Sequence, residues 1–122
     1  MKKNRILVVE DEESLLKLES ILFTSKGYVV TGVRDGKSAL EAIRADRPDL
    51  VVLDIMLPGL DGFEVCRSIK ENPETSSIPV VMLTAKKSSQ DLERGRLVGA
   101  DAYLTKPFKS VKVLEVIEGL IG

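Results

Sequence analysis

Several short apolar runs in this chain end on side chains that could take part in chemistry. Glu10 and Asp11 follow the first run and Asp54 a central one, while Thr84 and Lys106 follow two later runs. Runs of β-branched and aliphatic residues of this length are typical of strands buried on both faces of a parallel sheet. Because parallel strands bring their carboxyl ends to one edge, these five side chains are expected to meet in space.

Asp54 also has a simpler interpretation when its own stretch is taken alone. It stands between an apolar run and a turn in LVVLDIMLPGLDG at 50–62, where Pro58-Gly59 marks the bend. An acid at this place can merely cap the turn. The polar residues at the other strand ends favour a functional site instead.

Three carboxylates at one edge create a charge problem, because like charges raise each other's pKa. Protons or a cation must offset them. The chain has no histidine and a single cysteine, so the cation would bind to oxygen ligands, which predicts Mg²⁺ or Mn²⁺.

The remaining polar groups suit a phosphoryl group. Lys106 supplies a positive charge and Thr84 a hydroxyl donor for anionic oxygens. Asp54 is then the predicted nucleophile, forming an aspartyl phosphate. The metal, Lys106, Thr84 and the backbone N–H of Ala85 would stabilise the transferring group.

The elements that must position these residues alternate regularly along the chain. Strand patterns lie at 6–9, 29–33, 50–53, 79–83 and 102–105, and helical patterns begin near 14, 35, 62, 88 and 110. Right-handed crossovers then predict an α/β fold, a (βα)5 doubly wound parallel sheet of flavodoxin-like strand order 2-1-3-4-5. One domain is expected over 1–122, with its topological switch point between the first and third strands.

The first helical pattern predicts which side chains face the core. Leu15, Leu18 and Leu22 share one face, and Leu16 and Phe23 widen it.

The last helix has an apolar arc of about 160°, wider than a core-facing stripe needs. The arc consists of Val113, Leu114, Val116, Ile117, Leu120 and Ile121. Ordinary packing at a helix flank and a contact surface for a partner or a second copy are both open interpretations.

Composition excludes several classes of protein. The net charge of −1 offers no general attraction to nucleic acid or to an anionic membrane. No apolar run approaches the roughly 18 residues of a membrane-spanning helix. Cys66 is the only cysteine, so no internal disulfide forms, a core position is expected, and a reducing, cytoplasmic setting fits best.

Four stretches together carry a family resemblance over essentially the whole chain. They are VVEDEES at 8–14, PDLVVLDIMLPGLDG at 48–62, IPVVMLTA at 78–85 and GADAYLTKPF at 99–108. In this order and spacing the chain resembles a response-regulator receiver domain of two-component signal transduction. The resemblance implies that Asp54 accepts a phosphoryl group from a histidine kinase or phosphotransfer protein.

The resemblance also assigns metal ligands. Asp11 would bind Mg²⁺ directly, Glu10 through a water, and Asp54 and the backbone carbonyl of Met56 would complete the protein's share. Glu10 stands where an aspartate is commoner in the family.

A switch is implied as well. On phosphorylation the Thr84 hydroxyl would move toward the phosphoryl group and the Tyr103 ring would rotate inward. Lys106 would bind a phosphoryl oxygen, and the Lys106-Pro107 peptide is expected to be cis. Met56 and Lys86 flank the phosphorylation site in such folds, and we hypothesise that they shield it from the attacking water.

The output side follows from the same resemblance. The fourth helix, fifth strand and fifth helix would present the changed face to a downstream protein or a covalently linked output domain, with no direct nucleic-acid or membrane binding. A phosphorylation-dependent dimer is possible in the family. Ala102 and Val116 depart from the paired charges of its DNA-binding members and argue mildly against that dimer.

Three other functions fit the sequence less well. A dehalogenase-type phosphatase needs an acid two residues after the nucleophile, where this chain has Met56. A dinucleotide-binding domain needs glycines that VVEDEES lacks. A degenerate receiver, acting as a phosphorylation-independent binding module, tends to lose the acidic pair or the lysine, and both are present here. The prediction is therefore a signalling switch, not a turnover enzyme.

Overall fold

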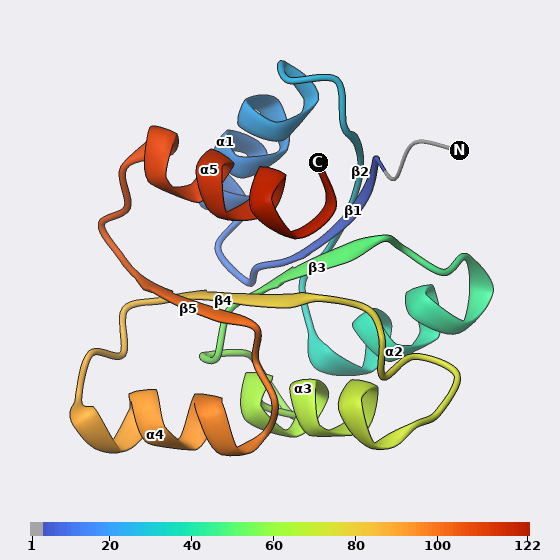
Figure 1. Ribbon diagram of the computed structural model, residues 1–122, viewed down its shortest axis with the longest axis vertical. Coiled ribbons are helices and arrows are strands. Elements are labelled where there is room, and N and C mark those ends of the chain that lie inside the picture. The colour runs from blue at the N-terminus through green and yellow to red at the C-terminus, as the bar shows by residue number, and fades with distance from the viewer. Residues whose placement is uncertain (1–3) are drawn as a thin grey trace.

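The chain forms one parallel five-stranded sheet with helices on both faces. A computed structural model describes residues 4–122, so the first three residues of the predicted domain lie outside the described residues. The strand order is β2-β1-β3-β4-β5, which confirms the predicted topology. Helices α1 and α5 cover one face, and α2, α3 and α4 cover the other (Figure 1). The strands are β1 Arg5–Val9, β2 Val29–Val33, β3 Leu50–Leu53, β4 Val80–Thr84 and β5 Ala102–Thr105, and the helices are α1 Glu13–Thr24, α2 Gly36–Ala45, α3 Gly62–Glu71, α4 Ser89–Leu97 and α5 Ser110–Ile121.

The central strands are buried on both faces, as their apolar sequences require. Every residue of β3 and of β4 is buried. Side chains alternate between the two faces with a period of two, so Val51 and Leu53 pack toward α2 and α3. Leu50 and Val52 pack with residues of α1 and α5 on the other side. Thr84 is the last residue of β4 rather than the first after it, one position later than predicted.

Helix α1 is turned differently from the sequence prediction. Leu18 was expected in the core, but it is 54% exposed, whereas Glu19 is 1% exposed. At about 100° per residue, Glu19 falls between Leu15 on one side and Phe23 on the other, at the centre of the apolar arc. The apolar residues on the two sides of Glu19 therefore determine the face of α1 that packs inward, and Glu19 is buried because it lies at the centre of that face. These residues are Leu15, Leu16, Leu22 and Phe23.

The helix boundaries have the predicted local causes. Asp35 was expected at one helix start and Ser88 or Ser89 at another; Asp35 and Ser88 are the caps, and each side chain accepts a hydrogen bond from a backbone N–H three residues later. Asp61 does the same for α3. Gly27 and Gly99 follow α1 and α4 with φ of 92° and 94°, the left-handed conformation that ends many helices.

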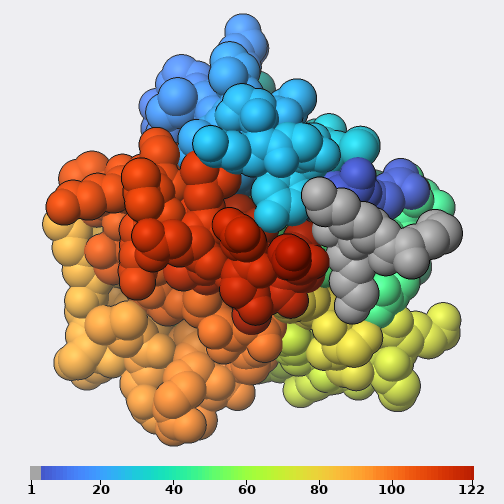
Figure 2. Space-filling view, turned by 45° about the horizontal axis from the view of Figure 1, so that its top comes forward, coloured from blue at the N-terminus to red at the C-terminus, as the bar shows by residue number. Residues whose placement is uncertain are grey.

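Helix α5 uses most of its wide apolar arc for packing within the domain. Val113 and Ile117 are fully buried. Leu114, Val116 and Ile121 pack against the same core cluster. In the space-filling view the red α5 lies between the blue-to-cyan segment of α1 and β2 and the orange segment of α4 and β5 (Figure 2). Ordinary packing thus accounts for all of the arc except Leu120, which is 37% exposed.

The turn that returns the chain from β3 to α3 depends on a glycine. A Cβ atom on Gly62 would lie 2.3 Å from the backbone oxygen of Asp54 and 2.5 Å from the Cα atom of Ile55. The first residue of α3 therefore packs directly on the backbone of the strand end.

We predict that Gly62→Ala destabilises the domain by about 2–3 kcal/mol, because the methyl group must displace backbone. Urea unfolding measures this change. Gly119→Ala is the matched control, since a Cβ atom there has no heavy atom within 4 Å, and it should stabilise by about 0.5–1 kcal/mol through helix propensity. Equal stabilities for the two variants would contradict the packing argument.

Candidate functional site

A lysine bridges two buried carboxylates at the carboxyl edge of the sheet. The Lys106 Nζ atom lies 2.7 Å from Glu10 Oε1 and 3.1 Å from Asp54 Oδ2. The side chains of Glu10 and Asp54 are 3% and 8% exposed, and that of Lys106 is 15% exposed. The predicted convergence of β1, β3 and β5 at this edge is therefore observed for these three side chains.

Backbone groups fix the orientation of the two acids. Asp54 Oδ1 accepts a hydrogen bond from the Met56 N–H, so its two oxygens face different partners. Glu10 Oε2 accepts from the Glu12 N–H. The Lys106 N–H donates to the Thr84 carbonyl at 2.8 Å, which ties the lysine loop to the end of β4. The Lys106-Pro107 peptide is cis, as predicted.

The predicted third acid does not join this cluster. Asp11 is exposed, and its backbone carbonyl accepts two hydrogen bonds from the Arg34 side chain, at 3.0 and 2.8 Å. Within residues 4–122 no three acidic or cysteine side chains are grouped closely enough to hold a metal ion together. The side chains of Glu10 and Asp54 are thus adjacent, while that of Asp11 lies at the rim.

Two hydroxyl groups meet the same loop beyond β4. Thr84 is fully buried, and its Oγ1 accepts a hydrogen bond from the Lys86 N–H at 3.3 Å. The Tyr103 hydroxyl donates to the Lys86 carbonyl at 2.9 Å. Ala85, expected to offer its N–H to a phosphoryl group, is exposed in the same loop.

The ionisation of the cluster reflects burial and mutual pairing. Burial raises the pKa of Glu10, and the hydrogen bond from Lys106 only partly opposes that shift. Burial acts to lower the pKa of Lys106, but the hydrogen bond to Glu10 and the charge of Asp54 outweigh it, and the pKa of Lys106 is raised. The lysine therefore stays charged between the two carboxyl groups.

Sequence reasoning missed Glu19, a buried acid of α1 whose ionisation is influenced by the charge of Glu10. It reaches from α1 toward Glu10, and its Oε2 atom is buried with no hydrogen-bond partner. Burial, followed by the charge of Glu10, raises the pKa of Glu19 to about 8. The available signal was its position at the centre of the apolar arc of α1.

The donor set at this edge fits a hard divalent cation. All nearby protein donors are oxygens, and two carboxylates stand side by side. Mg²⁺ usually takes one or two carboxylates and keeps several waters. The side chain of Asp11 is exposed and could therefore bind such a hydrated ion. Two carboxylates share a single lysine here, so one more positive charge would neutralise the cluster when both acids are ionised.

A hollow of about 450 Å³ lies over the loop that follows Asp54. Met56, Lys86, Asp91 and Arg94 are among the residues that line it. Met56 and Lys86, which the sequence placed beside the phosphorylation site, therefore stand on opposite loops of one opening.

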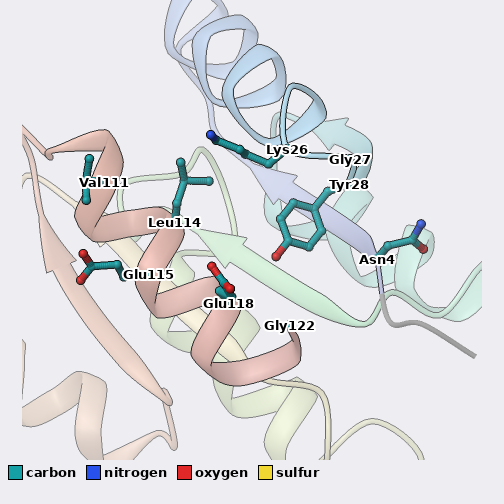
Figure 3. Close-up of a pocket in the computed structure, with 9 residues that line it drawn as sticks. All are labelled: Asn4, Lys26, Gly27, Tyr28, Val111, Leu114, Glu115, Glu118 and Gly122. Carbon is teal, nitrogen blue, oxygen red and sulfur yellow. The ribbon is translucent and has the colours of Figure 1, made fainter.

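Another hollow, of about 410 Å³, lies at the opposite edge of the sheet, between α5 and the start of β2. Figure 3 shows Tyr28 and Lys26 on one side of it and Leu114 and Glu118 of α5 on the other. Because this hollow is at the amino ends of the strands, it is separate from the acidic cluster.

The fold and the bridged carboxylates define a doubly wound α/β domain with an acidic site at its switch point. The family model for the response regulator receiver domain matches residues 6–118. The chain therefore belongs to the response-regulator receiver family, whose members are signalling proteins rather than turnover enzymes.

Similar proteins support this assignment. The transcriptional regulatory protein CseB of Streptomyces coelicolor is 40% identical over 119 residues, which are 98% of this chain and 50% of that protein. The DNA-binding response regulator MtrA of Mycobacterium tuberculosis is 46% identical over 107 residues, 88% of this chain and 46% of that protein. The chain thus spans about half the length of the curated relatives it matches.

Solved structures agree with the fold. The receiver domain of a signal transduction histidine kinase from Syntrophus aciditrophicus superposes with a TM-score of 0.92 at 33% identity, covering 97% of this chain and 89% of that one. The chemotaxis protein CheY4 of Vibrio cholerae has a TM-score of 0.90 at 28% identity, covering 96% and 98%. Among the described residues, no helix has the length and apolar character needed to cross a bilayer.

The raised pKa of Glu19 makes stability depend on pH. The unfolded chain loses this proton near the ordinary value of 4.5 and the folded chain near 8. The folded state therefore holds the extra proton between these values, and the free energy of unfolding falls as the pH rises through that window, by up to about 1.4 kcal/mol per pH unit.

We predict that Glu19→Gln makes this decline shallower, because glutamine has no proton to lose, while the raised pKa of Glu10 leaves a smaller decline in place. Urea unfolding between pH 5 and 8 in the presence of EDTA compares the variant with the wild type. Glu13→Gln, an exposed acid on the same helix, serves as control and should keep the wild-type profile. Parallel profiles for the wild type and Glu19→Gln would contradict the prediction.

Proposed function

We propose that this domain is a phosphorylation-operated switch in which Asp54 accepts the phosphoryl group. The observation that carries the proposal is the Lys106 ammonium group, which lies between the carboxylates of Asp54 and Glu10. A cation held beside a buried nucleophile offsets the charge that a phosphoryl group brings. The donor would be a phosphohistidine of a histidine kinase or of a phosphotransfer protein, in a cytoplasmic setting.

In the transfer step an Asp54 carboxylate oxygen forms a bond to phosphorus while the phosphorus–nitrogen bond of the phosphohistidine breaks. The electron pair of that bond remains on the imidazole. Lys106 then exchanges its contact with the Asp54 carboxylate for one with a phosphoryl oxygen. The Thr84 hydroxyl turns away from the Lys86 N–H toward a second phosphoryl oxygen. The N–H of Ala85 is proposed as a further donor.

Mg²⁺, held by Glu10, Asp11, Asp54 and the carbonyl of Met56, would neutralise phosphoryl oxygens during transfer. Two features support these ligands. The acids supply only oxygen donors, and the side chain of Asp11 is exposed and thus open to a hydrated ion.

Phosphorylation would then act as a local charge event on a two-state element. The loop after Thr84 is bonded to Tyr103 through the Lys86 carbonyl. Recruitment of the Thr84 hydroxyl by the phosphoryl group would therefore change the restraint on Tyr103. The face of α4, β5 and α5 would carry that change to a downstream protein or a linked output domain, with a second copy of the domain as a possible partner.

We predict that radiolabelled acetyl phosphate with Mg²⁺ labels the wild type and not Asp54→Ala, because the nucleophile is gone. Gel autoradiography with an acid-stability check identifies the acyl phosphate. Asp35→Asn is the matched control, since Asp35 caps α2 and asparagine also caps a helix, and it should be labelled normally. Label on Asp54→Ala would reject the assignment, and an unlabelled wild type would favour a phosphorylation-independent binding module.

A second prediction concerns the lifetime of the phosphorylated form. Met56 is 57% exposed and lines the opening together with Lys86, so both side chains can obstruct an attacking water. Met56→Ala with Lys86→Ala should shorten the lifetime by about 2- to 10-fold, a change of up to about 1.4 kcal/mol in the barrier. The decay of label after removal of donor measures it, with Lys87→Ala as control, and equal lifetimes would rule the shielding out.

A further inference from the structure

Helix α4 has a glycine where a helix normally carries a side chain. Gly95 is the only buried residue of α4, whose other residues are mostly polar. Its two leucines, Leu92 and Leu97, are 42% and 70% exposed. Glycine is the least favourable residue in a helix interior apart from proline, so its presence at the one buried position of α4 calls for a packing reason.

The space of the missing side chain is filled by Tyr103. A Cβ atom on Gly95 would lie 2.7 Å from Cδ2 and 3.0 Å from Cε2 of the Tyr103 ring, and 3.3 Å from Met82 Sδ. The ring therefore lies directly against the helix backbone. An alanine here would require the ring, the helix or both to move, because contacts under 3.0 Å are repulsive.

The same ring is bonded to the loop beside the candidate site. Its hydroxyl donates to the Lys86 carbonyl, and the Lys86 N–H donates to Thr84 Oγ1. A continuous path thus runs from the hydroxyl at the end of β4, through one residue of the loop, to the tyrosine ring, and from the ring to the backbone of α4.

Other contacts also join α4 to the domain. The Arg94 guanidinium stacks over the Phe63 ring at 4.3 Å, and Val98 is buried just after the helix. Arg94 is itself exposed, so its contact with Phe63 lies at the surface. Gly95 is the one buried residue of α4, and the side chain nearest to it is Tyr103, which is bonded to the loop of the site.

We propose that Gly95 is a positioning residue that seats the Tyr103 ring and couples the loop beyond Thr84 to α4. This inference rests on the proposed function, because it describes how that switch reaches α4. With glycine the ring can lie against the helix backbone, as it does in this structure; with alanine the ring is excluded from that position, and the link from the loop through Tyr103 to α4 is lost.

The chain offers a direct optical test, because it contains no tryptophan and only two tyrosines. In a Tyr28→Phe background Tyr103 is the only fluorescent reporter. Acrylamide quenching then measures the accessibility of its ring in the 122-residue chain, with and without acetyl phosphate and Mg²⁺, while parallel samples measure the label on Asp54.

We expect Gly95→Ala to raise the quenching constant of Tyr103 by about twofold, since a half-buried ring becomes exposed. Phosphorylation should lower quenching in the Gly95 protein and leave the alanine variant unchanged, although both acquire label. Gly119→Ala, the same substitution in open space on α5, should behave like its parent. The proposal would be overturned if the quenching constant of Tyr103 in Gly95→Ala equalled that of the parent both with and without phosphorylation.

A double-mutant cycle keeps the test valid if Gly95→Ala is poorly folded. In a Tyr103→Ala background the alanine at 95 has room, so it should raise Tm by a few degrees, as Gly119→Ala does. In the Tyr103 background it should lower Tm or raise quenching. If Gly95→Ala raised Tm equally in both backgrounds and left quenching of Tyr103 unchanged, the proposed positioning role of Gly95 would be rejected. Absence of label from the wild type would reject the proposed function instead.

Discussion

The pairing of Lys106 with Glu10 and Asp54 is the interaction on which the carboxyl edge of this sheet depends. Two carboxylates with side chains 3% and 8% exposed would be costly without a counter-charge. The lysine comes from the far end of the chain, so the charge balance is complete only when β1, β3 and β5 stand in the correct order. The topology and the electrostatics of the site therefore require each other.

The rest of the fold holds that trio in place. The N–H of Asp54 continues the sheet by donating to Val9, which fixes the acid at the strand end. Gly62 then lets α3 begin directly on that backbone. At β4 the Thr84 carbonyl accepts from Lys106, so the lysine is held by its main chain as well as by its charge. These restraints act through the backbone and place the three charged side chains at one edge of the sheet.

The strand order and the meeting of Glu10, Asp54 and Lys106 could be predicted, because buried parallel strands leave few choices of topology and bring their ends to one edge. The direction of Asp11 could not, since two hydrogen bonds from Arg34 to its carbonyl organise that loop. Burial of Glu19 could not be read from its type, since acids are rarely buried, and only its place between Leu15 and Phe23 on the helix indicates it. The bond from Tyr103 to the Lys86 carbonyl depends on loop backbone, which no side-chain pattern encodes. The roles of these residues in phosphorylation remain predictions.

The inward face of α1 makes this helix a locally frustrated element. An acid is buried while Leu18 and Ile21 are 54% and 68% exposed, so burial preferences of neighbouring residues oppose each other. Burial is the main cost of ionising Glu19 inside the domain, and the negative charge of Glu10 adds to that cost. Any positive charge that arrives next to Glu10 lowers that cost by Coulomb attraction. The ionisation of Glu19 in α1 is thereby linked to the charge at the acidic edge, although α1 contributes no residue to the bridge itself.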